Sequence, residues 1–411
     1  MHPKLKHLYV GIDIHRQTHT ASIIDAFGEK LGEITFQNKP SDFGKLLKEV
    51  NRHIAEGVTP IYALEDINSS GRPLAVFLLS KNYSVKYVNP SLTQLERKTQ
   101  SVYHKTDGHD SLCVARILLN RFGELPNANP EDLNWALSQL VARRSNLVKS
   151  ITSLVNQAQS QIIQHYPSYP GFFNSFDGKC ALEFWQKFPS SAKLKDITVT
   201  ELGEFLYENS SRYFGEKKAA QILESVENDN VAEVGFQEVR DFIISSTIRQ
   251  IKAVKKELEE VETQIKAILP LFGYKLQTMK GIDFITEAAL IAQIGDINRF
   301  SSADKLAKYS GISPVSYSSG KTDKQLANAL GDRTLHHIFY SLAVRVSNNA
   351  GASGKQVNPI FYDYYRKKIS EGKTGKQALK AVMRRLVNIV YGMMRHKTEY
   401  INPELPKVEN Q

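Results

Sequence analysis

The chain has 411 residues, of which 41% are hydrophobic and 23% are charged, and its formal net charge is +10 at pH 7. This length favours two or three domains over one core. No apolar run approaches the roughly 20 residues that span a bilayer, which argues against a membrane protein. The two distant cysteines, Cys113 and Cys180, argue against a disulfide scaffold and a cysteine-based zinc site. Since no signal peptide is evident at the basic start either, we expect a cytoplasmic location.

Most of the positive charge lies near the C-terminus. Residues 351–397 hold eleven Lys and Arg against only Asp363 and Glu371. Such a field attracts polyanions, of which nucleic acid is the commonest, although a solvated basic face without a partner is the alternative. Aromatic residues at 361–365 interleave with the cations, as in nucleic-acid interfaces, and a helical core stripe accounts for some of them. The candidate contacts are Lys280, Lys321, Arg333, Arg366, Lys367, Lys368, Lys373, Lys376, Arg384 and Arg385.

The first 125 residues alternate between strand and helix patterns and form a predicted α/β domain. Apolar alternation and polar turns predict an antiparallel meander of three strands, and the later segments follow helical or strand periodicity. The predicted order is β-β-β-α-β-α-β-α, with strands at 8–14, 20–26, 32–38, 60–65 and 84–90, helices at 41–56 and 72–82, and a last helix from about Thr106.

The middle of the chain, residues 126–270, is predicted to be helical. Apolar residues recur every seven positions over 137–158 and over 244–268, which indicates a helical hairpin or coiled coil. Two ordinary amphipathic helices are the equally good alternative. Residues 165–240, rich in Tyr and Phe, are interpreted as a mostly helical insertion between them, and Pro270 ends the second helix.

Residues 271–411 form a predicted, mainly α C-terminal domain. It begins with LQTMKGIDFITEAALIAQIGD, in which a short helix, the turn Gly281–Asp283 and a second helix resemble a helix-hairpin-helix. Such a turn offers backbone N–H groups to a phosphate. A purely structural turn is the alternative.

Four carboxylates of the first domain are candidates for a metal site. In the predicted sheet the strands carrying Asp13 and Glu65 are adjacent, while Asp107 and Asp110 lie one helical turn apart on one helix face. Crowded carboxylates need a cation, and hard oxygen ligands suit Mg²⁺ or Mn²⁺, which promote phosphodiester chemistry. The two helical acids can instead cap their helix. Asp66 competes with Glu65, because alternation lets only one of them face the site.

The joint pattern resembles the DEDD-type insertion-sequence transposases, a family that includes the Piv invertases and the bridge-RNA-guided recombinases. The resemblance spans nearly the whole chain outside 165–240. It is carried by the segments YVGIDIHRQTHTASIID, IYALE, VKYVNPSLTQLERK, KTDGHDSLCVARIL and MKGIDFITEAALIAQIGDINRFSSADKLAKYSGISPVSYSSGK. The glycine after Glu65 comes later here than the family pattern has it, at Gly71.

The resemblance implies a RuvC-like (RNase H-like) domain whose four acids match Asp13, Glu65, Asp107 and Asp110. It also implies a serine nucleophile, which falls on Ser319 of the Tyr-Ser-Ser-Gly segment, with Ser318 as the neighbouring alternative. By itself, the run SSGK at 318–321 is typical of a flexible polar loop. A family member is expected to recombine double-stranded DNA with a guide RNA, as a homodimer or homotetramer joined through the helices 137–161 and 244–268, and to be nucleoid-associated when bound to DNA.

Three rival functions remain open at this point. A RuvC-like nuclease, such as a junction resolvase, shares the acids but uses water, and so does not need Ser319. An ATP phosphotransferase of the actin and sugar-kinase type also begins with a strand Asp, but it requires a glycine-rich turn where Ile14, His15 and Arg16 follow Asp13. A catalytically dead nucleic-acid-binding relic is disfavoured by the complete set of acids.

Overall fold

The computed structural model divides the chain into two compact units, residues 1–138 with 271–411 and residues 139–270. None of the helices it describes is long and apolar enough to cross a bilayer. The side chains of Ser91, Asp132, 315–319, 322–326 and 349–350 are not described. The described residues are 2–65, 70–99, 106–128, 130, 132–232, 235–319, 322–326, 328, 331–350 and 354–402.

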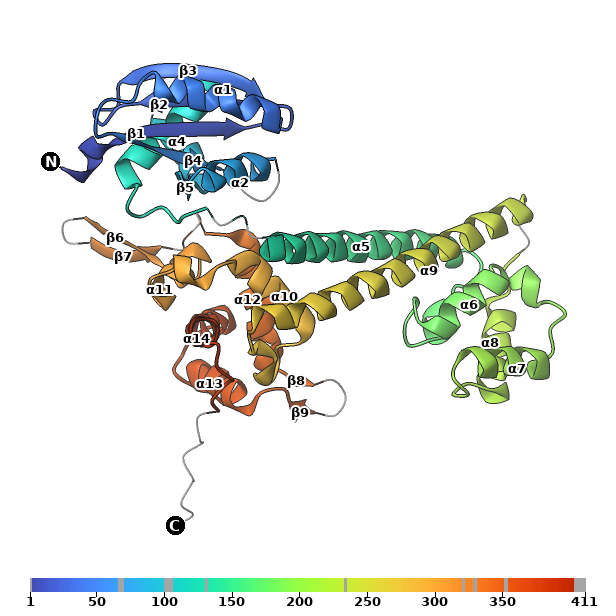
Figure 1. The fold of residues 1–411 in the computed structure, drawn as a ribbon. Helices are drawn as coiled ribbons and strands as arrows, with labels where there is room; N and C mark the ends of the chain where they lie inside the picture. Colours follow the sequence, from blue (N-terminus) through green and yellow to red (C-terminus); the bar gives the residue numbers. More distant parts are fainter. Residues whose placement is uncertain are drawn as a thin grey trace, which may run out of the picture. The chain divides into compact units, whose positions relative to one another are not determined.

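The N-terminal part of the first unit is built on a five-stranded mixed sheet (Figure 1). Its strands are β1 (His7–Ile14), β2 (Thr18–Ile24), β3 (Lys30–Gln37), β4 (Thr59–Leu64) and β5 (Ser84–Tyr87), in the order β3-β2-β1-β4-β5. The first three strands are antiparallel, whereas β4 runs parallel to β1 and β5 parallel to β4. The predicted meander and the adjacency of the first and fourth strands are confirmed, as an RNase H-like fold requires.

Helices cover both faces of this sheet. The side chains of α1 (Pro40–Asn51) and α2 (Arg72–Ser80) share one core with the sheet, and those of α4 (Asp107–Arg121) share another. The first helix ends five residues before the predicted end, and Gly57, with a φ of +78°, turns the chain toward β4. The sequence pattern also missed α3 (Pro90–Thr99), a mostly polar helix.

The second unit contains a pair of long antiparallel helices and a small helical subdomain. The helices α5 (Asp132–Ile162) and α9 (Gln237–Ile268) are joined by ion pairs of Arg143 with Glu257 and of Arg144 with Glu262. Between them, α6 (Lys179–Lys187), α7 (Val199–Asn209) and α8 (Glu216–Asp229) surround an aromatic core centred on Trp185. The mostly helical character predicted for this insertion is confirmed.

The C-terminal part of the first unit is mainly helical, as predicted. Its predicted helix-hairpin-helix contains one 3₁₀ turn, Leu276–Thr278, in place of a first α-helix. Two hairpins join the helices. The elements are α10 (Phe284–Ile294), α11 (Ala303–Tyr309), β6 (Val315–Ser319), β7 (Thr322–Leu326), α12 (Arg333–Val346), β8 (Asn349–Ala350), β9 (Lys355–Gln356), α13 (Pro359–Ser370) and α14 (Gly375–His396).

Candidate active site

Side-chain alternation along β1 directs Asp13 toward α4. Residues Val10 and Ile12 pack into the core of α1 and α2, while Tyr9, on the opposite face, packs with α4. Because successive side chains of a strand point to opposite faces, Asp13 follows Tyr9 on the α4 face. His15, two residues further and just beyond the strand, continues that face.

Gly11 lets α4 lie directly on β1. A Cβ atom at this position would be 2.1 Å from the backbone nitrogen of Ala115, so only glycine fits under the helix. The hydroxyl groups of Ser22 on β2 and Ser111 on α4 form a buried hydrogen bond of 2.7 Å, which fixes the helix along the sheet. As a result, the first turn of α4, with Asp107 and Asp110, lies at the end of β1 that carries Asp13.

Glu65 reaches the same face from β4. The parallel register pairs Ile12 with Leu64, so the residues that follow, Asp13 and Glu65, are neighbours across the two strands. Ala63 packs in the α4 core and Leu64 in the opposite core, which places Glu65 on the α4 side. The competing Asp66 lies outside the described residues.

The pKa of Asp13 reflects burial and the charges of its neighbours. The pKa of Asp13 is raised to about 6, chiefly because burial penalises the charged carboxylate. His15 lowers this pKa, and the negative charges of Asp110, Glu65 and Asp107 each raise it. Asp107 lies close enough to Asp13 to share an ion with it, and the charges of Glu65 and Asp110 are near enough to act on Asp13.

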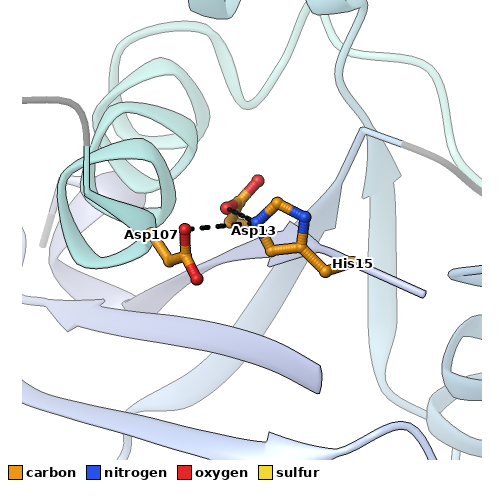
Figure 2. Close-up of side chains that lie close together, drawn as sticks. All are labelled: Asp13, His15 and Asp107. Atoms are coloured by element: carbon orange, nitrogen blue, oxygen red, sulfur yellow. Dashed lines mark ion pairs between the residues drawn. The ribbon is translucent and has the colours of Figure 1, made fainter. Parts of the chain in front are cut away.

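Two nitrogen-bearing side chains, His15 and Arg97, contact the cluster. The His15 Nε2 atom lies 3.1 Å from Asp13 Oδ2 and 3.2 Å from Asp107 Oδ1 (Figure 2). On the other side, Arg97 of α3 places its Nε atom 2.6 Å from Asp110 Oδ1. The cap of α4 is Thr106, whose hydroxyl accepts a hydrogen bond from the His109 amide, so capping does not occupy the acids.

The cluster suits a divalent cation. Three buried carboxylate oxygens, Asp13 Oδ2, Glu65 Oε1 and Asp110 Oδ1, have no hydrogen bond of normal geometry. Buried carboxylates are costly unless a positive charge neutralises them; Arg97 does so for Asp110, and a divalent cation would do so for the rest of the cluster. One ligand atom each from Asp13, His15 and Asp107 lies within 4.8 Å of the others, a separation that a single ion can bridge.

Sequence reasoning missed the two side chains that contact the acids, His15 and Arg97. His15 has a detectable signal, because its spacing of two residues from Asp13 puts both on one face of an extended chain. Arg97 gives no such signal, since its approach to Asp110 depends on how α3 packs against α4.

The two candidate serines lie in the hairpin β6–β7. The interpretation of this segment as a loop is wrong up to Ser319: Ser318 pairs with Asp323 and Ser319 with Thr322. The strand has only two apolar residues, Val315 and Tyr317, which is too short an alternation to indicate a strand. The flanking segments cross at Gly311 and Gly331, where a Cβ atom on Gly331 would be 2.2 Å from the Gly311 nitrogen. Gly320 and Lys321 lie outside the described residues.

The candidate nucleic-acid contacts differ in how they are paired. Arg384 binds the Asp304 carboxylate, and Lys368 binds that of Glu371 at 2.7 Å. Arg385 stacks over the Tyr364 ring at 4.8 Å, whereas the neighbouring aromatic Phe361 is buried in the core. The exposed candidates are Lys280, Arg333, Arg366, Lys367, Lys373 and Lys376.

Comparison with known proteins gives consistent matches along the chain. Residues 10–167 match a DEDD transposase model of the IS110 type, and residues 273–366 match that of the transposase IS116/IS110/IS902 family. A 44.8 kDa protein of insertion element IS116 from Streptomyces clavuligerus is 23% identical over 95% of both chains. The pilin gene-inverting protein of Moraxella lacunata is 23% identical over 95% of this chain and 97% of its own.

Proposed function

Since the chain belongs to the IS116/IS110/IS902 transposase family, we propose that it cuts and rejoins double-stranded DNA as the recombinase of a mobile element. The observation that carries this proposal is the convergence of Asp13, Glu65, Asp107 and Asp110 at one end of the sheet. The pilin gene-inverting relatives support rejoining as well as cutting, because an inversion requires both.

The acids are proposed to hold Mg²⁺ or Mn²⁺. A divalent cation bound there supplies positive charge to the oxygens of the scissile phosphate. The buried carboxylates of Asp13 and Asp110 form the inner wall, and the more exposed Asp107 lies on the solvent side, where a DNA backbone can approach. Arg97 holds the Asp110 carboxylate in place.

Ser319 is the proposed nucleophile, with Ser318 as the alternative. Its hydroxyl oxygen forms a bond to the scissile phosphorus, the bond from phosphorus to one deoxyribose oxygen breaks, and the serine proton ends on that oxygen. The phosphoserine link conserves the bond for resealing, which hydrolysis by water does not. Support comes from the family resemblance of the Tyr-Ser-Ser-Gly segment and from its place at the end of strand β6.

A guide RNA and an oligomer belong to the same proposal. The eleven cations between residues 351 and 397 support a polyanionic partner beyond the DNA itself. Exposed apolar side chains on α9, Val239, Phe242 and Ile243, support a homodimer or homotetramer formed through the long helices. Light scattering after size-exclusion chromatography of the full chain, with and without RNA, tests both.

A covalent-adduct assay tests the recombinase function. The full chain is incubated with the DNA ends of its element, the flanking RNA and Mg²⁺, and protein–DNA adducts are resolved under denaturing conditions. We expect Asp13→Asn and Ser319→Ala to abolish the adduct, while Ser318→Ala retains it. Cleavage by Ser319→Ala with wild-type efficiency would instead identify a nuclease that uses water.

A further inference from the structure

His15 occupies a position that the four-acid pattern does not account for. Its Nε2 atom lies between two carboxylates from different elements, 3.1 Å from Asp13 Oδ2 on β1 and 3.2 Å from Asp107 Oδ1 on α4 (Figure 2). One ring nitrogen thus approaches two oxygens at once. One ligand atom from each of the three side chains lies within 4.8 Å of the others, a separation that one ion can bridge.

One of the three side chains is buried and the other two are exposed, so the group is open to solvent on one side. The Asp13 side chain is only 9% exposed and its Oδ2 atom has no hydrogen bond of normal geometry. The side chains of His15 and Asp107 are 51% and 57% exposed. Asp13 is therefore the buried side of the group, and His15 and Asp107 are its solvent-exposed side. Water or a phosphate oxygen can reach a bound ion from the exposed side.

We propose that His15 is a nitrogen ligand of the divalent cation held between Asp13 and Asp107. This inference rests on the proposed function, because it assumes that the acid cluster holds a metal. Imidazole nitrogen is a borderline donor that suits transition-metal ions, whereas Mg²⁺ prefers carboxylate, carbonyl and water oxygens. The site is therefore expected to bind Mn²⁺ more tightly than Mg²⁺, and His15 is the residue that produces this preference.

The chain offers a matched control in His109. This residue lies on α4 between the two acids of the helix, but its Nε2 atom contacts the sulfur of Cys113, 3.8 Å away along the same helix. His109 is two residues from Asp107, as His15 is two residues from Asp13, so His109→Gln removes an imidazole at matched spacing from an acid of the cluster. This control separates the effect of losing any imidazole near the cluster from the effect of losing the proposed ligand.

The test is Mn²⁺ binding to the full chain, measured by calorimetry and by electron spin-echo modulation. We expect His15→Gln to weaken Mn²⁺ binding about tenfold or more, to leave Mg²⁺ binding, measured by competition, within about threefold, and to remove the imidazole ¹⁴N modulation. His109→Gln should retain both the affinity and the modulation. Asp13→Asn should lose binding of both ions.

Two results would overturn the assignment of His15. Unchanged Mn²⁺ binding by His15→Gln would show that the imidazole is not a ligand, and tighter binding would show that it competes with the ion. Absence of ¹⁴N modulation in the wild-type chain would also show that the imidazole is not a ligand. If Asp13→Asn still loses both ions in these cases, the acid cluster remains a metal site. If Asp13→Asn binds normally, the metal part of the proposed function fails as well.

Discussion

Gly11 on β1 and Ala115 on α4 are in direct backbone contact, because a Cβ atom on Gly11 would be 2.1 Å from the Ala115 nitrogen. The acids of α4 reach Asp13 only through this close approach. We expect Gly11→Ala to push the helix away, to reduce the free energy of unfolding by about 3 kcal/mol or more, and to weaken Mn²⁺ binding. Urea unfolding and a Mn²⁺ titration measure the two effects.

Gly44 in α1 provides the control for this substitution. A Cβ atom there has no heavy atom within 4 Å beyond its own helix and chain neighbours, and the residue is inside a helix. Gly44→Ala should raise the free energy of unfolding by up to about 1 kcal/mol and leave Mn²⁺ binding unchanged. Equal stability of the two variants would show that the helix can rest on β1 without a glycine.

Asp13 should make the metal-free protein less stable as the pH rises. Its pKa in the folded chain is about 6, above its ordinary value, so between about pH 4 and 6 the folded state holds a proton that the unfolded chain releases. This stabilisation is complete below that window and absent above it. Because asparagine stays neutral, we expect the free energy of unfolding of Asp13→Asn to be higher than that of the wild type by on the order of 1–2 kcal/mol at pH 8. Near pH 4 the two free energies should be equal.

Urea unfolding in EDTA at several pH values measures this difference. Asp42 is the control of opposite sign, since a hydrogen bond from Lys45 lowers the pKa of its carboxyl. Asp42→Asn should therefore be less stable than the wild type at pH 8, and the gap should close as the pH falls through the lowered pKa. A pH-independent difference for Asp13→Asn would contradict the burial of its charge.

Arg97 neutralises the buried Asp110 carboxylate through an ion pair of 2.6 Å. We expect Arg97→Gln to reduce the free energy of unfolding in EDTA by about 1–3 kcal/mol, because a buried charge loses its partner. Saturating Mn²⁺ should shrink this reduction, since the bound ion then screens the same carboxylate. The exposed neighbour Lys98 is the control. Lys98→Gln should leave the free energy of unfolding unchanged, both in EDTA and with saturating Mn²⁺. A reduction that Mn²⁺ does not alter would place Asp110 outside the metal site.

Strand order predicted from the sequence that the strands carrying Asp13 and Glu65 are adjacent, whereas the choice of Glu65 over Asp66 rested on the family resemblance. Side chains of a strand alternate between its two faces, and short connections favour neighbouring strands. These two rules place Asp13 and Glu65 beside each other, in agreement with the register of β1 and β4. Interactions set by helix packing were not predictable in this way. Arg97 reaches Asp110 because α3 packs against α4, and no spacing in the sequence encodes that approach.

The hairpin β6–β7 shows a second limit of sequence reasoning. Its strands consist largely of Ser, Thr, Asp, Lys and Gln, and the only apolar alternation, Val315 and Tyr317 in β6, is too short to indicate a strand by itself. The pairing is favoured instead by the flanking segments, which cross where Gly311 and Gly331 touch. Gly311 and Gly331 are 20 positions apart in the sequence. Only the folded chain shows that their backbones are in contact with each other.

The basic helix α14 allows a last prediction on DNA binding, because two of its cations differ in pairing. Lys376 is exposed in the first turn, whereas Arg384 already binds the Asp304 carboxylate. Removing one cation that binds a phosphate should lower the slope of log affinity against log salt by about 0.9 for duplex DNA. We therefore expect Lys376→Gln to reduce the slope by about 1, and Arg384→Gln to reduce it much less. Fluorescence anisotropy with duplex DNA at several salt concentrations measures both slopes, and equal reductions would show that Arg384 leaves Asp304 to bind the DNA.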